Sequence, residues 1–424
     1  MELIPNRAGW RLALILVLSC FLNSCSSTKW TAKETDQQQM VGDITYLASD
    51  KLKGRTFGSE GEMKAGDYIA SRFKLLGLKP MGDNGTYFQS LTVKNNNPHE
   101  VEFADAKAPG YLNGRNVIGY LDQGAPYTVI VGAHYDHLGM GSFGSLYTGD
   151  PAIHNGADDN ASGTATILEL AQRLLPYKEH NYLFIAFTGE ENGLWGSNYF
   201  TKHPTIELTK VAAMINFDMV GRMSENKIAI NGTGTSPAWN DLILTANVDS
   251  LDITMGESGV GPSDHTSFYL IDIPSIHFFT GAHEDYHKPS DDVDKINADG
   301  MEKVADMAER ILRSLGNNGK AKLEFTKTKD ADQGATPKME VTLGIVPDYL
   351  YDQTGLRIDG VREGKPAANA GLQKGDIIMK MGDKDIKDIY AYMEVLSSYH
   401  HGDKTEVVVL RNGKEMKFEI HFLN

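Results

Sequence analysis

Residues 183–193, LFIAFTGEENG, form an apolar run that leads into two adjacent carboxylates, Glu190 and Glu191, and then a glycine. A run with apolar residues at successive positions is typical of a strand buried on both faces, as in sheets covered by helices. Two acids at the end of such a strand either lie in a solvated turn or have separate roles in a site. The choice between these interpretations depends on the residues at the ends of the other strands.

Similar apolar runs recur along the chain and alternate with segments of helical periodicity. Predicted strands are 115–121, 127–133, 181–187, 211–217, 226–231 and 273–279. Predicted helices are 61–76, 161–175, 194–202, 237–248 and 298–314. This alternation predicts an α/β fold with a mostly parallel or mixed central sheet and helices on both faces. Ligands of such sheets bind beyond the carboxyl ends of the strands.

Length and charge limit the possible classes of protein. The chain has 424 residues and a formal net charge of −15, without a run rich in lysine and arginine, so nucleic acid is not an expected partner. The length favours two domains. We predict a first domain at 41–315, a polar linker at 316–338 and a compact unit at 339–424.

The N-terminal segment predicts export. Residues 1–24 contain an apolar core, 12–22, that is too short to span a membrane comfortably and fits a signal peptide. Leu-Asn-Ser-Cys then resembles a bacterial lipobox, in which Cys25 is lipidated and becomes the first mature residue, followed by a tether at 25–40. We expect a membrane-anchored lipoprotein on the periplasmic side or the cell surface, with ordinary cleavage near the same place as the alternative.

Five clusters of acidic residues and histidines lie at or just after predicted strand ends. They are GAHYDH (132–137), HNGADDNASG (154–163), GEE (189–191), NFDMVG (216–221) and EDYHKPSDD (284–292). Each alone is compatible with a turn or a helix cap. Together they can converge at one edge of the sheet, where imidazole and carboxylate ligands without thiolates suit Zn²⁺, with Co²⁺ or Mn²⁺ as substitutes.

The order GAHYD, GADDNASG, GEE, NFDM and YHKPSDD resembles the co-catalytic zinc aminopeptidases, the family of bacterial leucyl aminopeptidases and plasma glutamate carboxypeptidases, over roughly residues 41–315. The resemblance implies two Zn²⁺ per chain. The implied roles are first-metal ligands His134 and Asp218, second-metal ligands Glu191 and His287, bridging ligand Asp158 with a cis peptide bond to Asp159, orienting residue Asp136, general base Glu190, and pocket residues Asp264 and His265.

That ligand set is chemically consistent. One bridging carboxylate, one histidine and one further acid give each ion three protein ligands and leave a position open for water or substrate. The base must not itself be a ligand, and adjacent residues at a strand end point to different sides, which allows Glu190 and Glu191 to differ in role. The other histidines are expected at the surface or outside the ligand set: His137, His154, His265 and His283.

Residues 339–424 resemble a PDZ domain, an α+β unit with a small barrel-like sheet. The matching pieces are LGI (343–345), GLRIDGVREGKPAANAGLQKGDIIMKMGD (355–383), a helix near 388–398 and a hairpin turn at Asn412-Gly413. The resemblance implies that Leu343, Gly344 and Ile345 form a loop that holds the C-terminal carboxylate of a peptide or protein partner. A packing role for the unit is the alternative.

We therefore expect an exported metallo-exopeptidase, an aminopeptidase with peptide substrates. Three alternatives remain open: a carboxypeptidase of the same family, a glutaminyl cyclase-like acyltransferase with one zinc, and a non-catalytic binding protein on this scaffold.

Overall fold

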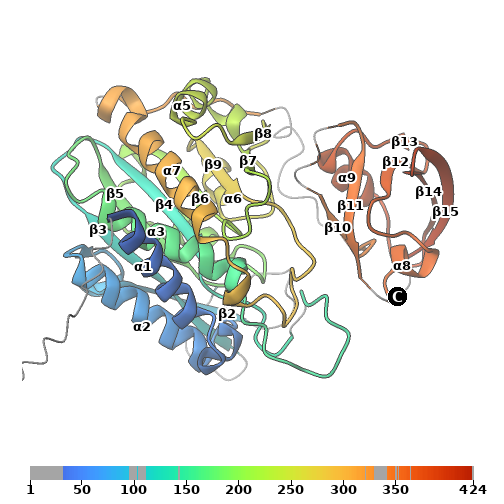
Figure 1. The fold of residues 1–424 in the computed structure, drawn as a ribbon, viewed down its shortest axis with the longest axis horizontal. Helices are drawn as coiled ribbons and strands as arrows, with labels where there is room; N and C mark the ends of the chain where they lie inside the picture. The colour runs from blue at the N-terminus through green and yellow to red at the C-terminus, as the bar shows by residue number, and fades with distance from the viewer. Residues whose placement is uncertain are drawn as a thin grey trace, which may run out of the picture.

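The computed structural model of the chain describes residues 32–94, 103, 111–141, 144–319, 321–328, 341–348, 351, 353–362 and 364–422. They form a larger α/β unit and a smaller, mostly β unit at the C-terminal end (Figure 1). The predicted signal peptide and Cys25 lie outside the described residues. In the described part of the chain, no helix has both the length and the apolar composition that crossing a membrane requires.

The larger unit is built on a mixed sheet with the strand order β1-β3-β5-β4-β6-β9-β7-β8 and β2 beside β3. The strands are β1 (Lys79–Pro80), β2 (Phe88–Lys94), β3 (Tyr111–Leu121), β4 (Thr128–His134), β5 (Asn181–Phe187), β6 (Val211–Phe217), β7 (Lys227–Asn231), β8 (Asp252–Gly256) and β9 (Ser275–Phe279). The four central strands β5, β4, β6 and β9 are parallel. Every predicted strand has a counterpart, whereas β1, β2 and β8 were not predicted.

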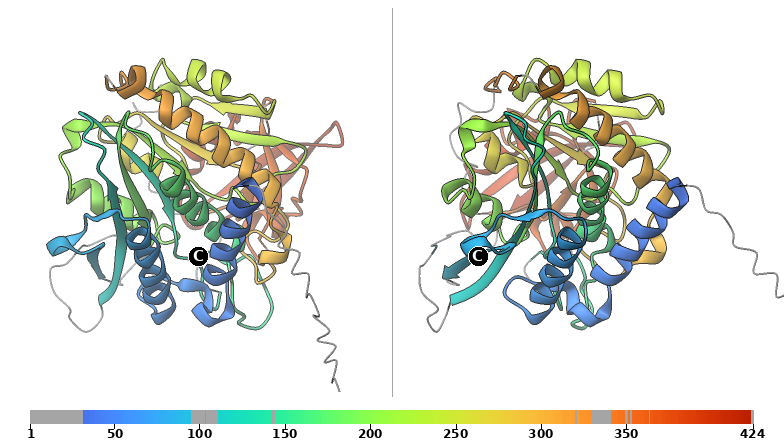
Figure 2. Two further views of the ribbon diagram at one scale, coloured as in Figure 1. Left: turned by 60° about the vertical axis from the view of Figure 1, so that its left-hand side comes forward. Right: turned by 90° about the vertical axis from the view of Figure 1, so that its left-hand side faces the viewer.

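Helices cover both faces of this sheet, as predicted. They are α1 (Ala32–Leu47), α2 (Glu60–Leu75), α3 (Gly163–Arg173), α4 (Trp195–Lys202), α5 (Trp239–Ala246), α6 (His265–Tyr269) and α7 (Ala298–Gly319), with short turns η1 (Asp50–Arg55), η2 (Asp83–Gly85), η3 (Ala157–Ser162), η4 (Leu208–Lys210), η5 (Thr233–Thr235) and η6 (Val293–Lys295). Helices α1, α2, α3, α5 and α7 share one apolar core. Helices α4 and α6 contribute Phe200 and Phe268 to a second core on the opposite face. In both views of Figure 2, α1, α3 and α7 lie side by side over the sheet.

Part of the predicted tether belongs to the folded domain. Residues 32–40 form the first half of α1, so the tether prediction is wrong for them. Met40 and Ile44 are fully buried against α3 and α7, and Gln37 donates a hydrogen bond to Asp299 at 2.9 Å. The polar composition of 32–40 concealed this docking, because Met40 is the one buried residue among 36–40, whose side chains the structure describes, and one apolar position gives no visible periodicity.

Part of the predicted linker is also packed on the first domain. Helix α7 continues to Gly319, and residues 321–328 lie along the domain instead of leaving it. Thr326 donates its N–H to the Thr235 carbonyl at 2.8 Å, and the Phe325 ring lies 5.7 Å from that of Tyr269. The linker prediction is therefore wrong for 316–319 and 321–328, while 320 and 329–338 lie outside the described residues.

The C-terminal unit has an antiparallel sheet and an apolar core of its own. Its elements are β10 (Ile345–Pro347), β11 (Leu356–Val361), α8 (Pro366–Ala370), β12 (Ile377–Met381), β13 (Lys384–Asp385), α9 (Ile389–Leu396), β14 (Lys404–Arg411) and β15 (Lys414–His421). The sheet runs β10-β11-β12-β14-β15 with β13 beside β12, all antiparallel. Asn412 and Gly413 both have positive φ (52° and 74°), which is the conformation of the predicted two-residue hairpin turn.

The docking of α1 can be tested by truncating its buried methionine. Met40→Ala removes a fully buried side chain and is expected to lower the free energy of unfolding of the larger domain by ~2–5 kcal/mol. Gln38→Ala, at an exposed position on the same helix, serves as the control and should change it by less than ~0.5 kcal/mol. Denaturant unfolding would measure both, and equal stability of the two variants would contradict the docking.

Candidate metal centre and active site

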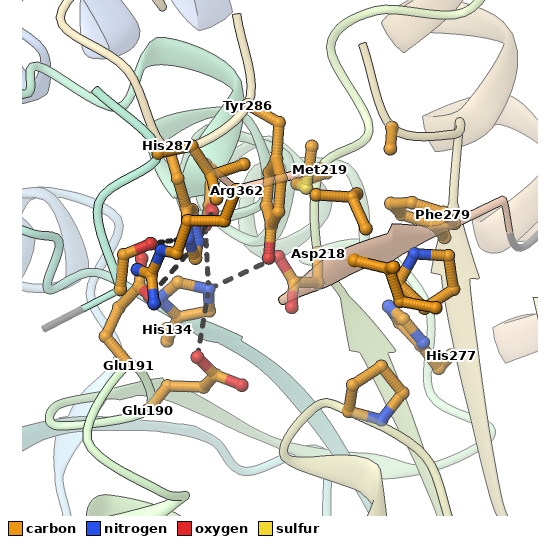
Figure 3. Close-up of a pocket in the computed structure, with 18 of the residues that line it drawn as sticks. His134, Glu190, Glu191, Asp218, Met219, His277, Phe279, Tyr286, His287 and Arg362 are labelled. Atoms are coloured by element: carbon orange, nitrogen blue, oxygen red, sulfur yellow. Dashed lines mark hydrogen bonds and ion pairs between the residues drawn. The ribbon is translucent and has the colours of Figure 1, made fainter. Parts of the chain in front are cut away.

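The parallel strands bring the predicted motifs to one edge of the sheet. His134 is the last residue of β4, Asp218 directly follows β6, and Glu190 and Glu191 follow β5 after a short turn. Asp159 lies in η3, just before α3, and His287 lies in the loop after β9. Because these strands point the same way, their carboxyl ends meet, and side chains from distant segments converge there (Figure 3).

One group of ligands gathers around His134. Its Nε2 lies 3.2 Å from Asp218 Oδ1 and 3.3 Å from Asp159 Oδ1, and these three residues are arranged closely enough to hold one cation. The other ring nitrogen, Nδ1, faces Asp136, at 3.3 Å from its carbonyl oxygen and 3.7 Å from Oδ1. Asp136 is therefore placed to fix the ring so that Nε2 points into the group.

A second group shares Asp159 with the first. His287 Nε2 lies 3.1 Å from Asp159 Oδ2 and 3.3 Å from Glu191 Oε2, while its Nδ1 donates to the Gly144 carbonyl at 2.9 Å. His137 also reaches this group, with Nδ1 2.6 Å from Glu191 Oε1. His137 is buried and not at the surface, and with Asp159 and Glu191 it forms a group that could hold a metal ion, so its place outside the ligand set stays a prediction.

The shared carboxylate is Asp159 and not Asp158, so the prediction is wrong by one residue. Asp158 Oδ1 accepts the Gly221 N–H at 2.6 Å, and Oδ2 lies 3.1 Å from His283 Nε2, away from both groups. The cis peptide bond is likewise between Asp159 and Asn160, not between Asp158 and Asp159. Two adjacent aspartates look alike in a sequence, and only the path of the chain through η3 determines which one faces the sheet edge.

The turn that carries Asp159 is held by Asp291, which sequence reasoning did not select. Its carboxylate accepts the Asp158 N–H at 3.0 and 3.1 Å and the Asp159 N–H at 3.0 Å. Burial and the charge of Asp158 together raise the pKa of Asp291 to about 6, against the opposing effect of the hydrogen bond from the Asp159 N–H. The sequence motif that pointed to His287, YHKPSDD, also contains Asp291, four residues further on.

Arg55 is a second supporting residue that the sequence did not reveal. Its fully buried guanidinium donates to the carbonyls of Tyr135 at 2.8 Å, Asn155 at 2.6 Å and Gly156 at 3.1 Å. Burial lowers the pKa of Arg55 to about 10, and the charges of Asp136 and Asp159 oppose that shift. These carbonyls lie 80 to 101 residues further along the chain, so no local pattern distinguishes Arg55 from a surface residue.

The two adjacent glutamates have different environments. Burial acts to raise the pKa of Glu191, but His287 and His137 outweigh it and lower the pKa to about 2. Burial raises the pKa of Glu190 well above its usual range, with His134 opposing and Asp218 reinforcing the shift. Glu190 Oε2 is 3.9 Å from His134 Nε2, and Glu190 belongs to neither metal-binding group. Glu191 is thus paired with two imidazoles, whereas Glu190 lies outside both metal-binding groups.

The donor set fits zinc. Burial lowers the pKa of His134 and His287, but nearby carboxylates reverse this effect and raise both pKa values well above the usual range, so the groups attract positive charge. His137 Nε2 and Asp136 Oδ2 are buried without a hydrogen-bond partner among the described residues. Nitrogen and oxygen donors without sulfur, buried beside excess acid, are suited to a divalent cation of this kind.

A cavity of about 330 Å³ opens onto both groups. Apolar side chains line part of it, including Met219, Phe279 and Val346, and the His277 ring also faces it (Figure 3). Neither predicted pocket residue is part of the lining, so that prediction is wrong. Asp264 is buried behind the wall, where burial raises its pKa to about 7, and His265 stacks on His277 with ring centroids 4.9 Å apart.

The remaining predicted residues are distributed between the site and its surroundings. His154 is buried near the second group, and neither it nor His283 belongs to a metal-binding group of the described residues. Gly344 and Ile345 of the predicted carboxylate loop line the same cavity, whereas Leu343 is fully buried in the core of the C-terminal unit.

Comparison with known proteins agrees with this geometry. Residues 116–312 match peptidase family M28, and residues 323–422 match the PDZ domain. The aminopeptidase YwaD of Bacillus subtilis is 31% identical over 197 residues, which are 43% of this chain and 40% of YwaD. The chain thus spans less than half the length of that curated relative.

Two solved structures share the fold. The aminopeptidase from Aneurinibacillus sp. strain AM-1 has a TM-score of 0.51 at 20% identity, covering 69% of this chain and 95% of that one. The glutaminyl cyclase of Bacteroides thetaiotaomicron has a TM-score of 0.52 at 18% identity, covering 66% and 97%. At these identities the likeness concerns the fold alone.

The chain is thus built from two known classes of domain. The α/β unit with the paired histidine and carboxylate groups carries the match to peptidase family M28. The mostly β unit that follows it is a PDZ domain.

The assignment of the shared ligand can be tested by comparing the two aspartates. Asp159→Asn is expected to abolish most zinc binding, because the altered side chain faces both groups. Asp158→Asn is the matched control and should retain most of the zinc, because an amide oxygen can still accept the Gly221 N–H. Zinc content after dialysis would be measured by mass spectrometry. Equal loss in both variants would contradict a special role for Asp159.

Proposed function

We propose that the protein is an exported metallo-exopeptidase, an aminopeptidase that uses two Zn²⁺ per chain. The observation that carries the proposal is the position of Asp159, whose two carboxylate oxygens lie 3.3 Å from His134 Nε2 and 3.1 Å from His287 Nε2. A carboxylate placed in this way can join two ions. Asp218 completes the first ligand set with His134, and Glu191 completes the second with His287, with His137 or with both.

Such a pair of ions, when bound, supplies the charge that polarises a substrate carbonyl and lowers the pKa of a water. The chain supplies the proton transfer. Glu190 lies beside the first ligand set without belonging to it, so its carboxylate is free to accept a proton from water and deliver it to the leaving amine. Asp136 accepts the Glu190 N–H at 3.2 Å and thereby ties the base to the segment that directly follows His134.

The acyl side of the substrate would fit the apolar part of the cavity. Met219, Phe279 and Pro262 line it beside the metal-binding groups and provide a surface for an apolar side chain. The similarity to the aminopeptidase YwaD supports an aminopeptidase over a carboxypeptidase. The glutaminyl cyclase of Bacteroides thetaiotaomicron shares the fold, and a single-zinc acyltransferase is therefore the second candidate.

The signal peptide, lipidation at Cys25 and membrane anchoring remain part of the proposal. They rest on the sequence of residues 1–25 alone.

The role of Glu190 can be tested by removing its charge. Glu190→Gln is expected to keep the zinc content of the wild type and to lower kcat by ~10²–10⁴-fold, because the base is lost and the ligands are not. Glu284→Gln, at an exposed position in the loop that carries His287, should leave both unchanged. Undiminished turnover by Glu190→Gln would exclude Glu190 as the base.

The reaction type can be tested with aminoacyl-nitroanilides. The zinc-loaded wild type is expected to release nitroaniline from substrates with a free N-terminus and not from acylated ones, because an aminopeptidase requires the free amine. Zinc content close to two per chain should accompany this activity. Cyclisation of an N-terminal glutamine with one zinc per chain would favour the acyltransferase instead.

A further inference from the structure

The PDZ domain forms one wall of the catalytic cavity. The cavity that opens onto the metal-binding groups is also lined by Thr342, Gly344, Ile345, Val346, Pro347 and Arg362. They belong to the predicted carboxylate loop and the residue before it, to the edge strand β10, and to the position directly after β11. A peptide bound with one end at the metal centre would therefore meet the PDZ domain of the same molecule within the same cavity.

Arg362 is anchored in this wall but its charge is not neutralised. Its Nε and Nη2 donate to the Ser145 carbonyl at 3.1 and 2.7 Å, which ties the PDZ domain to the loop after β4. No carboxylate within ion-pairing distance of Arg362 occurs in the described part of the chain, whereas Arg357, on the same strand pair, is paired with Asp348. Burial lowers the pKa of Arg362, with Tyr286 opposing the shift, but a guanidinium stays charged at neutral pH.

A half-buried cation without a counterion favours an anionic ligand. Guanidinium carries five N–H donors, and the Ser145 carbonyl uses only two of the nitrogens. A carboxylate is the planar acceptor that fits the free edge best, and the pair is stronger in a partly desolvated cavity than in water. The acids near His134 and His287 do not oppose such a ligand once divalent cations balance their charge.

The neighbouring backbone can guide an extended peptide to Arg362. In the described sheet, β10 is at the edge and pairs only with β11, so its outer side is open to strand addition. Arg362 donates its N–H to the Gly344 carbonyl at 2.7 Å, which places the cation at the carboxylate-loop end of β10. Gly344 has a φ of +72°, and a Cβ there would collide with Lys365, so glycine keeps the backbone of this loop accessible.

We propose that Arg362 is a specificity-determining residue of the peptidase site, which selects substrates that carry a carboxylate on the leaving side of the scissile bond. The proposal rests on the proposed function above and specifies its substrate class. The carboxylate is either the C-terminus of a short peptide or an acidic side chain. The PDZ domain thus binds part of the substrate that the catalytic domain of the same chain cleaves.

The test compares substrates that differ only in this carboxylate. The first pair is Leu-Gly-Gly and its C-terminal amide, and the second is Leu-Asp-Gly amide and Leu-Asn-Gly amide. For zinc-loaded wild type, Arg362→Gln and Arg362→Lys, kcat and KM would be measured on all four. In at least one pair, Arg362→Gln should lower the carboxylate-to-amide ratio of kcat/KM by about 10–100-fold, mainly through KM, and the lysine variant should lower it less.

Arg357→Gln is the matched control, because it removes an arginine from the same strand pair outside the cavity lining. Its ratios should equal those of the wild type. The pair that responds to Arg362 identifies the source of the carboxylate. Equal losses on carboxylate and amide substrates in Arg362→Gln would overturn the inference and leave only a structural tie to Ser145, with the proposed function intact. Failure of the zinc-loaded wild type to cleave any of the four would instead contradict the proposed function.

Discussion

The carboxylate of Asp159 lies between two imidazoles, and the rest of the site depends on that position. One of its oxygens lies 3.3 Å from His134 Nε2 and the other 3.1 Å from His287 Nε2, at a buried position that borders the cavity. Several buried acids next to one another are unfavourable unless cations balance them, since each uncompensated buried charge costs several kcal/mol. The fold therefore gathers a set of charges that divalent ions stabilise, and the four parallel strands make this gathering possible.

The shared carboxylate is positioned by two residues that act differently. Asp291 fixes the backbone of η3 by accepting the N–H groups of Asp158 and Asp159. Arg55 fixes the turn before η3 by donating to the carbonyls of Asn155 and Gly156. Its positive charge also interacts favourably with Asp136 and Asp159. Neither residue is a ligand in either metal-binding group. Such outer interactions determine where ligands point and how basic they are, and they are as necessary as the ligands themselves.

The two domains are joined at the site and not only along the chain. Residues 321–328 run along the peptidase domain, and Arg362 bonds to the loop after β4, so the carboxylate loop faces the cavity. A PDZ domain in this position lines the cavity beside the candidate metal ligands, where it would limit how a peptide leaves the proposed site. The contact that packs the two domains together also places the domain at the cavity, so a packing role and a role in recognition do not exclude each other.

Local sequence determined the elements of the fold and most of the candidate ligands. Apolar runs such as LFIAF predicted the buried strands, and the residues at their ends, His134, Glu191 and Asp218, lie where the parallel sheet required. Strand β8 was missed because its pattern is short and half exposed. The polar composition of 32–40 likewise hid the start of α1, whose packing rests on Met40.

Tertiary structure alone decided which of two adjacent aspartates is shared, that His137 joins the second group, and that the PDZ domain lines the cavity. Asp158 and Asp159 have the same chemistry, and they differ only in the direction that η3 gives to their side chains. Arg55 and Arg362 act through carbonyls that lie far away in the sequence. Hydrophobic period is a local property that a sequence displays, whereas contacts between distant segments exist only after the chain has folded.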